Sequence, residues 1–185
     1  MKDITKEMKV IIIGGGSWGV AIASLVALKV GKAFILCSNK DRAKNISNGK
    51  IDRFPNIILS PNIYAGINPK EIMKNASLII IATEVKRALS FCKSINEFTS
   101  EDAPVLLASK GFSNDGKVLA LALSENLSKY HIGVISGPSF AGEVMNKKPT
   151  ALLVSGKDLV VKLASDVLHS QQLRIYGSND VIGAS

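Results

Sequence analysis

Three glycines near the amino terminus have the spacing of a phosphate-binding turn. Gly14, Gly16 and Gly19 form the pattern GxGxxG within GGGSWG. The pattern directly follows an apolar, β-branched run at residues 8–13 and opens a helical pattern at residues 17–30. In this context the free N–H groups at the start of the helix can bind the pyrophosphate of a dinucleotide. A glycine-rich turn that merely packs well between a strand and a helix is the alternative, and it stays open.

The motif assigns each glycine a separate task. We expect Gly14 to make the tight turn, Gly16 to let the main chain approach the pyrophosphate, and Gly19 to let the helix pack closely on the strand. The predicted site therefore depends on main-chain amides, which these glycines leave accessible.

The end of the second predicted strand, residues 33–38, should contact the adenosine ribose. A carboxylate there would accept a hydrogen bond from the 2′-hydroxyl of NAD, whereas basic residues accommodate the additional phosphate of NADP. This chain has Asn39 and Lys40 at that point, so the choice stays open and leans towards tolerance of NADP. Lys40 and Arg42 are candidates for the 2′-phosphate, and an exposed basic pair at the start of a helix is the alternative.

Two later strands also end in residues that could act on a ligand. ASKGF places Lys110 just past one buried strand, and SGPSFAGEV places Gly137, Pro138 and Ser139 just past the next. Ligands bind at the carboxyl ends of strands in open parallel sheets, so the three glycine-bearing turns should share one edge. A lysine there supplies a positive charge for a phosphate or for an oxygen on a reacting carbon. A solvated loop lysine is the alternative.

Strands and helices alternate along the chain and position these turns. Apolar runs predict further strands at residues 77–83, 103–111, 131–139, 150–156 and 173–177. Helical patterns cover residues 41–48, 85–98, 117–129, 139–146 and 157–170. The proline-bearing segment 50–69 should be irregular, with at most short strands. The alternation indicates a doubly wound, Rossmann-like, mostly parallel sheet with helices on both faces, in one domain over residues 1–185.

Composition excludes several classes of function. The formal charge of +8 suits an anionic ligand, but the basic residues form no dense run and the aromatic residues form no stacking platform, so nucleic acid is a poor fit. Consecutive glycines argue against a membrane span at residues 9–31, and the acidic residues of MKDITKEMK argue against a secretion signal. Cys37 and Cys92 lack CxxC spacing and the two histidines lie far apart, so we expect no metal site and a reducing cytosol.

The motifs GGGSWGVAIA, SKGF and GPSFAGEV, in this order and spacing, resemble the N-terminal domain of bacterial NAD(P)-dependent sn-glycerol-3-phosphate dehydrogenase. The resemblance covers essentially the whole chain. It implies a cytoplasmic oxidoreductase that uses NAD or NADP to interconvert glycerol 3-phosphate and dihydroxyacetone phosphate for glycerophospholipid synthesis. It leaves a homodimer open.

The resemblance also implies roles for individual residues. Beyond the glycine motif, it implies cofactor contacts at Ser17, Trp18, Asn39, Lys110 and Ala141. It implies substrate contacts at Lys110, Gly137 and Ser139.

Three departures from the family pattern matter. Thr83 and Glu84 stand where the family usually has a proline-containing turn, and they bring a carboxylate near the pyrophosphate. Cys37 and Asn39 replace a more usual tryptophan and a basic or polar residue. Family members continue into a helical domain whose lysine is the proposed proton acceptor, and this chain stops at Ser185 before it. We therefore expect a chain that binds dinucleotide, holds no general acid–base residue and turns over little substrate.

Other readings of the sequence remain open. One is a different dehydrogenase with the same cofactor fold, against which GPSFAGEV and SKGF argue. Another is a non-catalytic dinucleotide-binding module, such as a redox-sensing or regulatory domain. A basic nucleic-acid-binding protein is the third, and it predicts strongly salt-dependent DNA affinity.

Overall fold

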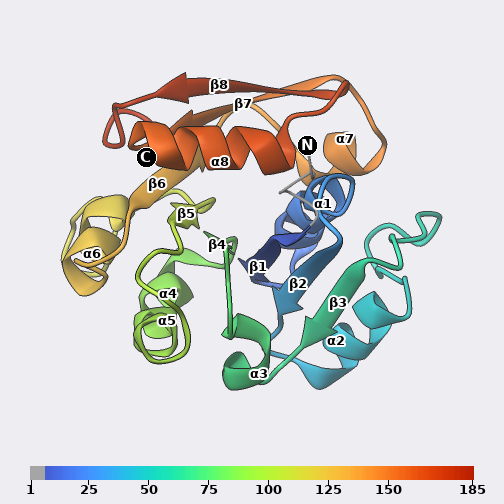
Figure 1. Ribbon diagram of the computed structural model, residues 1–185. Coiled ribbons are helices and arrows are strands. Elements are labelled where there is room, and N and C mark those ends of the chain that lie inside the picture. Colours follow the sequence, from blue (N-terminus) through green and yellow to red (C-terminus); the bar gives the residue numbers. More distant parts are fainter. Residues whose placement is uncertain (1–6) are drawn as a thin grey trace.

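The computed structural model describes residues 7–185, in which eight strands form one sheet in the order β3-β2-β1-β4-β5-β6-β7-β8 (Figure 1). The strands are β1 (Lys9–Ile13), β2 (Lys32–Leu36), β3 (Ile63–Gly66), β4 (Leu78–Ile81), β5 (Val105–Leu107), β6 (Ile132–Ser136), β7 (Thr150–Ser155) and β8 (Leu173–Ser178). Only the β6–β7 pair among them is antiparallel. The segment MKDITKEMK, whose acidic residues argue against a secretion signal, lies mostly outside the described residues.

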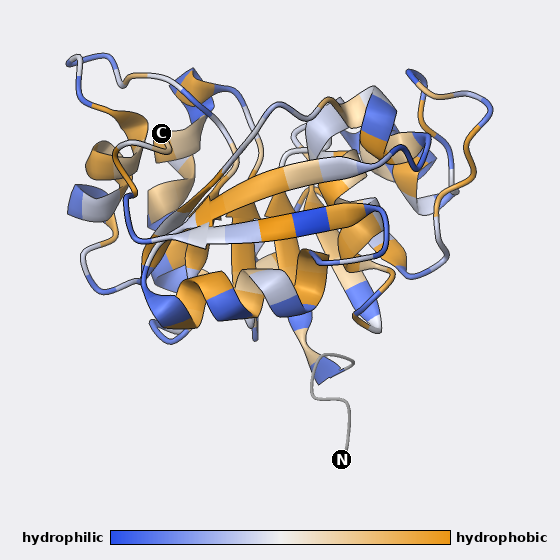
Figure 2. Ribbon diagram, turned by 90° about the horizontal axis from the view of Figure 1, so that it is seen from above, coloured by the Kyte–Doolittle hydropathy of each residue, from blue (hydrophilic) through white to orange (hydrophobic). Residues whose placement is uncertain are grey.

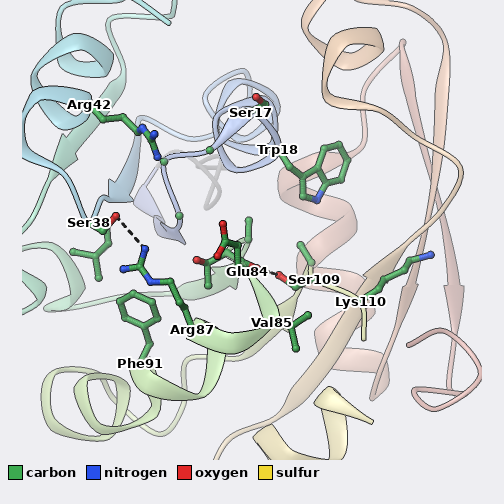
Figure 3. Close-up of a pocket in the computed structure, with 17 residues that line it drawn as sticks. Ser17, Trp18, Ser38, Arg42, Glu84, Val85, Arg87, Phe91, Ser109 and Lys110 are labelled. Atoms are coloured by element: carbon green, nitrogen blue, oxygen red, sulfur yellow. Dashed lines mark hydrogen bonds between the residues drawn. The ribbon is translucent and has the colours of Figure 1, made fainter. Parts of the chain in front are cut away.

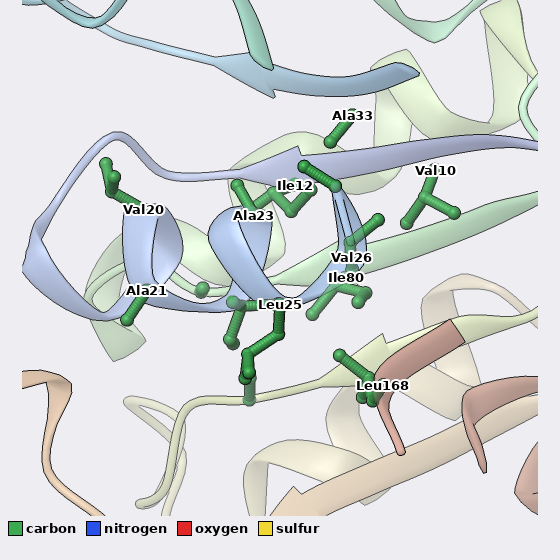
Figure 4. Close-up of a cluster of buried hydrophobic side chains, with 14 of the residues drawn as sticks. Val10, Ile12, Val20, Ala21, Ala23, Leu25, Val26, Ala33, Ile80 and Leu168 are labelled. Atoms are coloured by element: carbon green, nitrogen blue, oxygen red, sulfur yellow. The ribbon is translucent and has the colours of Figure 1, made fainter. Parts of the chain in front are cut away.

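Helices cover both faces of the sheet. They are α1 (Ser17–Val26), α2 (Lys40–Ser47), α3 (Pro69–Met73), α4 (Val85–Ala88), the 3₁₀ turn η2 (Leu89–Phe91), α5 (Cys92–Phe98), α6 (Leu119–Asn126), α7 (Ala141–Met145) and α8 (Asp158–Leu168). Successive residues of a strand point to opposite faces, so Val10 and Ile12 pack with α1 and α8, as Figure 4 shows in part, whereas Ile11 and Ile13 pack with α5 and α6. The predicted doubly wound fold is confirmed.

Helix α1 is apolar almost all round because it is covered on several sides. It contacts β1 and β2 beneath it and α7 and α8 beside it, and seven of its ten residues are buried. Figure 2 shows hydrophobic strands in the middle of the sheet, whereas the surrounding helices carry both hydrophobic and hydrophilic residues. Within residues 7–185, no helix is both long and apolar enough to cross a bilayer.

Strand β7 runs antiparallel to its neighbour β6. The connection between them, residues 137–149, contains the five-residue helix α7. The chain turns back at the carboxyl end of β6, with Ser136 paired to Leu153. Alternation of strands and helices does not reveal this direction.

The segment 50–69 contains one short strand, as expected, and the start of a helix that was not predicted. Its short strand β3 pairs in parallel with β2, and α3 follows it. Helix α3 is absent from the predictions, although Asn68 caps it, Pro69 fills its first position and Glu71 accepts a hydrogen bond from the Asn68 side chain at 2.8 Å. The predicted helix 85–98 is also divided, into α4, η2 and α5.

Candidate functional site

The turn between β1 and α1 (the glycine turn, residues 14–19) requires glycine at two positions for steric reasons. Gly14 has a φ of +126°, and a Cβ there would overlap the carbonyl of Ala82 at the end of β4. A Cβ on Gly19 would overlap the carbonyl oxygen of Gly14 and would touch Ile12. These contacts confirm the predicted tight turn and the close packing of helix on strand.

Gly16 differs from both, because a Cβ built on it meets no atom within 4 Å. It is the N-cap of α1 and offers no side chain to the N–H groups of the first turn, which also contains no acidic residue. The first N–H groups of a helix have no intrahelical acceptor and carry partial positive charge. The space at Gly16 and the free amides beyond it fit a pyrophosphate on geometric grounds.

A cavity of about 450 Å³ opens over this turn (Figure 3). Its walls come from the carboxyl ends of four parallel strands: the glycine turn after β1, Ser38 after β2, Glu84 after β4 and Lys110 after β5. The hydroxyl of Ser109 donates a hydrogen bond to the carbonyl of Thr83, which ties the last two strand ends together. The sheet thus brings together residues that lie far apart in the sequence.

A smaller cavity of about 210 Å³ adjoins the first and is lined by Gly137 and Ser139. Gly137 has a φ of +147°, and Ser139 Oγ donates to the Ala151 carbonyl at 2.8 Å, so the turn after β6 is fixed to β7. Trp18 and Lys110 line both cavities. The predicted convergence of the three turns at one edge is confirmed, and Lys110 lies where the two spaces meet.

Cations outnumber anions in the larger cavity, which is lined by Arg42, Arg87 and Lys110 and by the single carboxylate of Glu84. Beneath the glycine turn, the Cys37 thiol is buried and packs under Gly15. Burial raises its pKa to about 11, and the positive charge of Arg42 opposes this shift. The cavity therefore suits an anion. The Cys37 thiol beneath the turn stays protonated near neutral pH.

Three residues predicted as cofactor contacts lie apart from these cavities. The side chain of Asn39 caps α2, accepting a hydrogen bond from the Arg42 N–H at 2.9 Å. Lys40 is exposed at the first position of α2, and neither residue is part of the cavity walls. Ala141 begins α7 and packs against the apolar cluster that includes α1.

Arg87 is a cavity residue that the sequence reasoning missed. It lies in α4, and its Nη1 donates to Ser38 Oγ at 3.2 Å across the carboxyl edge. A signal was present, since Lys86 and Arg87 stand at the start of a helical run, where the helix dipole disfavours cations. A basic pair at the start of a helix that follows a strand therefore favours an anion-binding site there.

Comparison with known proteins gives the context for this geometry. The family described as NAD-dependent glycerol-3-phosphate dehydrogenase N-terminus matches residues 9–161. The chain belongs to this family. The glycerol-3-phosphate dehydrogenase (NAD(P)+) of Halothermothrix orenii is 30% identical over 181 residues, which are 95% of this chain and 52% of that protein. The Neorickettsia sennetsu protein of the same name is 28% identical, over 96% of this chain and 55% of its own length.

Solved structures agree on the fold of the family. The crystal structure of glycerol-3-phosphate dehydrogenase from Coxiella burnetii has a TM-score of 0.86 and 24% identity, covering 95% of this chain and 55% of that one. A UDP-D-ManNAc dehydrogenase from Pyrococcus horikoshii has a TM-score of 0.72 at 11% identity, covering 94% of this chain and 48% of that one. This chain spans about half the length of the curated relatives it matches.

Proposed function

We propose that this chain is the dinucleotide-binding domain of an NAD(P)-dependent sn-glycerol-3-phosphate dehydrogenase. The enzyme would interconvert glycerol 3-phosphate and dihydroxyacetone phosphate and so supply glycerophospholipid synthesis in the cytoplasm. The glycine turn carries the proposal: Gly14 and Gly19 fix its shape, and Gly16 leaves open the space before the free amides of α1. Membership of the family supports the choice of reaction.

The residues divide between two tasks. The pyrophosphate side of the cofactor would be held by Gly14, Gly16, Ser17, Trp18 and Gly19. The nicotinamide of the cofactor supplies hydride transfer when bound. Gly137 and Ser139 would contact the substrate in the smaller cavity. Lys110 lines both cavities and would direct its positive charge at the substrate phosphate or at the oxygen of the reacting carbon.

Binding of the cofactor is the direct test. Calorimetric titration of the purified 185-residue chain with NADH and with NADPH should give one site for at least one of them. A chain with neither site would contradict the proposal. A chain that binds DNA with a steep salt dependence would favour the nucleic-acid alternative instead.

We further propose that the chain alone binds cofactor but turns over little substrate. The reaction needs a proton moved at the same carbon that exchanges hydride, and such acid–base help is typically worth about 10²- to 10⁴-fold. We expect the group that moves the proton to lie outside these residues. A steady-state assay with dihydroxyacetone phosphate and NADPH should therefore show turnover at least about 100-fold below that of the Halothermothrix orenii relative. Comparable turnover would contradict this expectation.

A chimaera separates this enzyme from a non-catalytic module with the same fold. Joining the chain to the carboxyl-terminal half of the Halothermothrix orenii protein should restore turnover. Lys110→Met in that chimaera should lower kcat by about 100-fold or more because a charge-stabilising group is removed. Lys93→Met, on the exposed side of α5, is the matched control. A folded chimaera that binds cofactor but remains inactive would favour the regulatory module.

A further inference from the structure

The end of β2 offers no carboxylate to a ribose 2′-hydroxyl. Cys37 is buried, Ser38 is hydrogen-bonded to Arg87, and the side chain of Asn39 is used to cap α2. Asp41, the first carboxylate after the strand, is exposed in α2 and is not part of the cavity walls. The hydrogen-bond acceptor that usually selects NAD is therefore missing from this position.

Two guanidinium groups reach the same place from different elements. Arg87 comes from α4 and donates to Ser38 Oγ at 3.2 Å. Arg42 comes from the first turn of α2 and passes over the glycine turn, where its Cδ would lie 3.3 Å from a Cβ on Gly15. Figure 3 shows both side chains extending into the cavity around the end of β2.

Among residues 7–185, neither guanidinium forms an ion pair with a carboxylate. The ion pairs of Lys117, Lys129 and Lys162 lie elsewhere on the surface. Two cations facing one cavity repel each other, and a dianion between them would relieve that repulsion. Arginine suits this purpose because its planar fork can donate two parallel hydrogen bonds to a phosphate.

We propose that Arg42 and Arg87 bind the 2′-phosphate of NADP and make this domain prefer NADP to NAD. The proposal rests on the proposed function, because it concerns the adenosine end of the same cofactor. It transfers the role predicted for Lys40 to Arg87, which lies some fifty residues further along the chain but reaches the end of β2 across the sheet edge. Ser38 positions the Arg87 guanidinium through its hydroxyl.

The same cavity also contains one carboxylate, that of Glu84. A single carboxylate beside three cations leaves a net positive site, so a phosphate remains favoured there. The charges are arranged unevenly around the cavity. Glu84 follows β4 beside the glycine turn, whereas Arg87 extends across towards the end of β2. The positive charge is concentrated at the adenosine end.

The test compares ligands with and without the 2′-phosphate. Dissociation constants of the full 185-residue chain are measured for NADPH, NADH, adenosine 2′,5′-bisphosphate and 5′-AMP. We expect NADPH to bind at least about tenfold more tightly than NADH, with the same order for the two adenosine fragments. The preference for NADPH should weaken as ionic strength rises, because the added contact is between exposed charges.

Variants assign the preference to the two arginines. Arg87→Ala and Arg42→Ala should each weaken NADPH by about tenfold and change NADH by less than about twofold. Lys86→Ala and Lys44→Ala remove the same charge from exposed neighbours on the same helices and serve as matched controls. Arg87→Lys keeps the charge without the fork, and it should retain only part of the preference.

The outcomes separate this inference from the proposed function. If neither NADPH nor NADH binds, the proposed function is overturned. Equal affinity of the unmodified chain for NADPH and NADH would overturn only the inference, and the two adenosine fragments decide this even if a variant fails to fold. Equal weakening of both nucleotides by Arg87→Ala, or the same selective loss in Lys86→Ala, would also overturn it.

Discussion

The carbonyl oxygen of Gly14 occupies the space that a side chain on Gly19 would need. The two residues lie on either side of the strand-to-helix turn, so this contact sets how closely α1 approaches β1. The same closeness brings the N-terminus of α1 to the sheet edge where the other strand ends meet. Packing and ligand binding are therefore linked in one turn, and substitutions can separate them.

Gly19→Ala should destabilise the fold. Its Cβ would collide with main-chain atoms of Gly14, which cannot rotate away, so α1 must shift from the strand. Overpacking of this kind costs about 1–3 kcal/mol, and we expect about 2 kcal/mol in urea-induced unfolding. A free energy of unfolding equal to that of the unmodified chain would show that the turn adjusts without cost.

Gly16→Ala should leave the stability of the fold nearly unchanged but weaken cofactor binding. A Cβ there meets no protein atom, and the φ of −77° suits alanine. A poorer N-cap and a less flexible unfolded chain have opposing effects, each within about 1 kcal/mol. The methyl group would stand where the pyrophosphate approaches the amides, so affinity for NADH or NADPH should fall by about tenfold or more. Unchanged affinity would place the pyrophosphate elsewhere.

Trp18 should report on ligand binding, because it is the one tryptophan of the chain and lines both cavities. Its side chain is half-buried. NADPH should shield its ring, so quenching of its fluorescence by acrylamide should become weaker on saturation, by about twofold. Adenosine 2′,5′-bisphosphate, which lacks the nicotinamide half, should protect it less. Full quenching by acrylamide in the NADPH complex would contradict the proposed position of the cofactor.

Glu84→Gln should strengthen binding of both nucleotides. The carboxylate lines the cavity beside the glycine turn, where it repels the phosphates of the ligand. Exposed charge interactions are worth about 0.2–1 kcal/mol, so we expect affinities about two- to fivefold higher, with a smaller gain at high salt. Glu97→Gln, on the exposed surface of α5, is the matched control. Weaker binding by Glu84→Gln would instead show that the carboxylate accepts hydrogen bonds from a ribose.

The parts of the site that were predicted from the sequence are those fixed by local geometry. Gly14 and Gly19 could be assigned because a tight turn and close packing both follow from the motif and its neighbouring strand and helix. Lys110, Gly137 and Ser139 could be grouped because parallel strands end at one edge. No distance between side chains was needed for either step.

The parts that were missed depend on where side chains and strands point in the folded chain, which the residue types alone do not determine. Asn39 caps α2, which fixes the helix so that Arg42 reaches back over the glycine turn while Lys40 is exposed at its first position. Arg87 acts on the end of β2 only because β4 and β2 both neighbour β1 in the sheet. The reversed direction of β7 is likewise not visible in the alternation of strands and helices. Each depends on tertiary placement rather than on residue type.

Cys37 should make stability depend on pH in alkaline solution. Burial raises the pKa of its thiol to about 11 from an ordinary value of 9.0, with Arg42 opposing the shift. Between these values the folded chain keeps a proton that the unfolded chain has lost, so the stabilising contribution is present below about pH 9 and is lost as the pH rises. From about pH 8 to about pH 10 this costs about 1 kcal/mol.

The matched comparison is Cys37→Ala, measured by urea unfolding at the same two pH values. The variant should be less stable throughout, because it leaves a gap under Gly15, but it should lose about 1 kcal/mol less than the unmodified chain on going to the higher pH. Cys92, whose pKa is also raised by burial, is present in both proteins, so its contribution cancels. Equal pH dependence in the two proteins would mean that the thiol under the glycine turn ionises as easily in the folded chain as in the unfolded one. The turn would then be more open to water than its packing indicates.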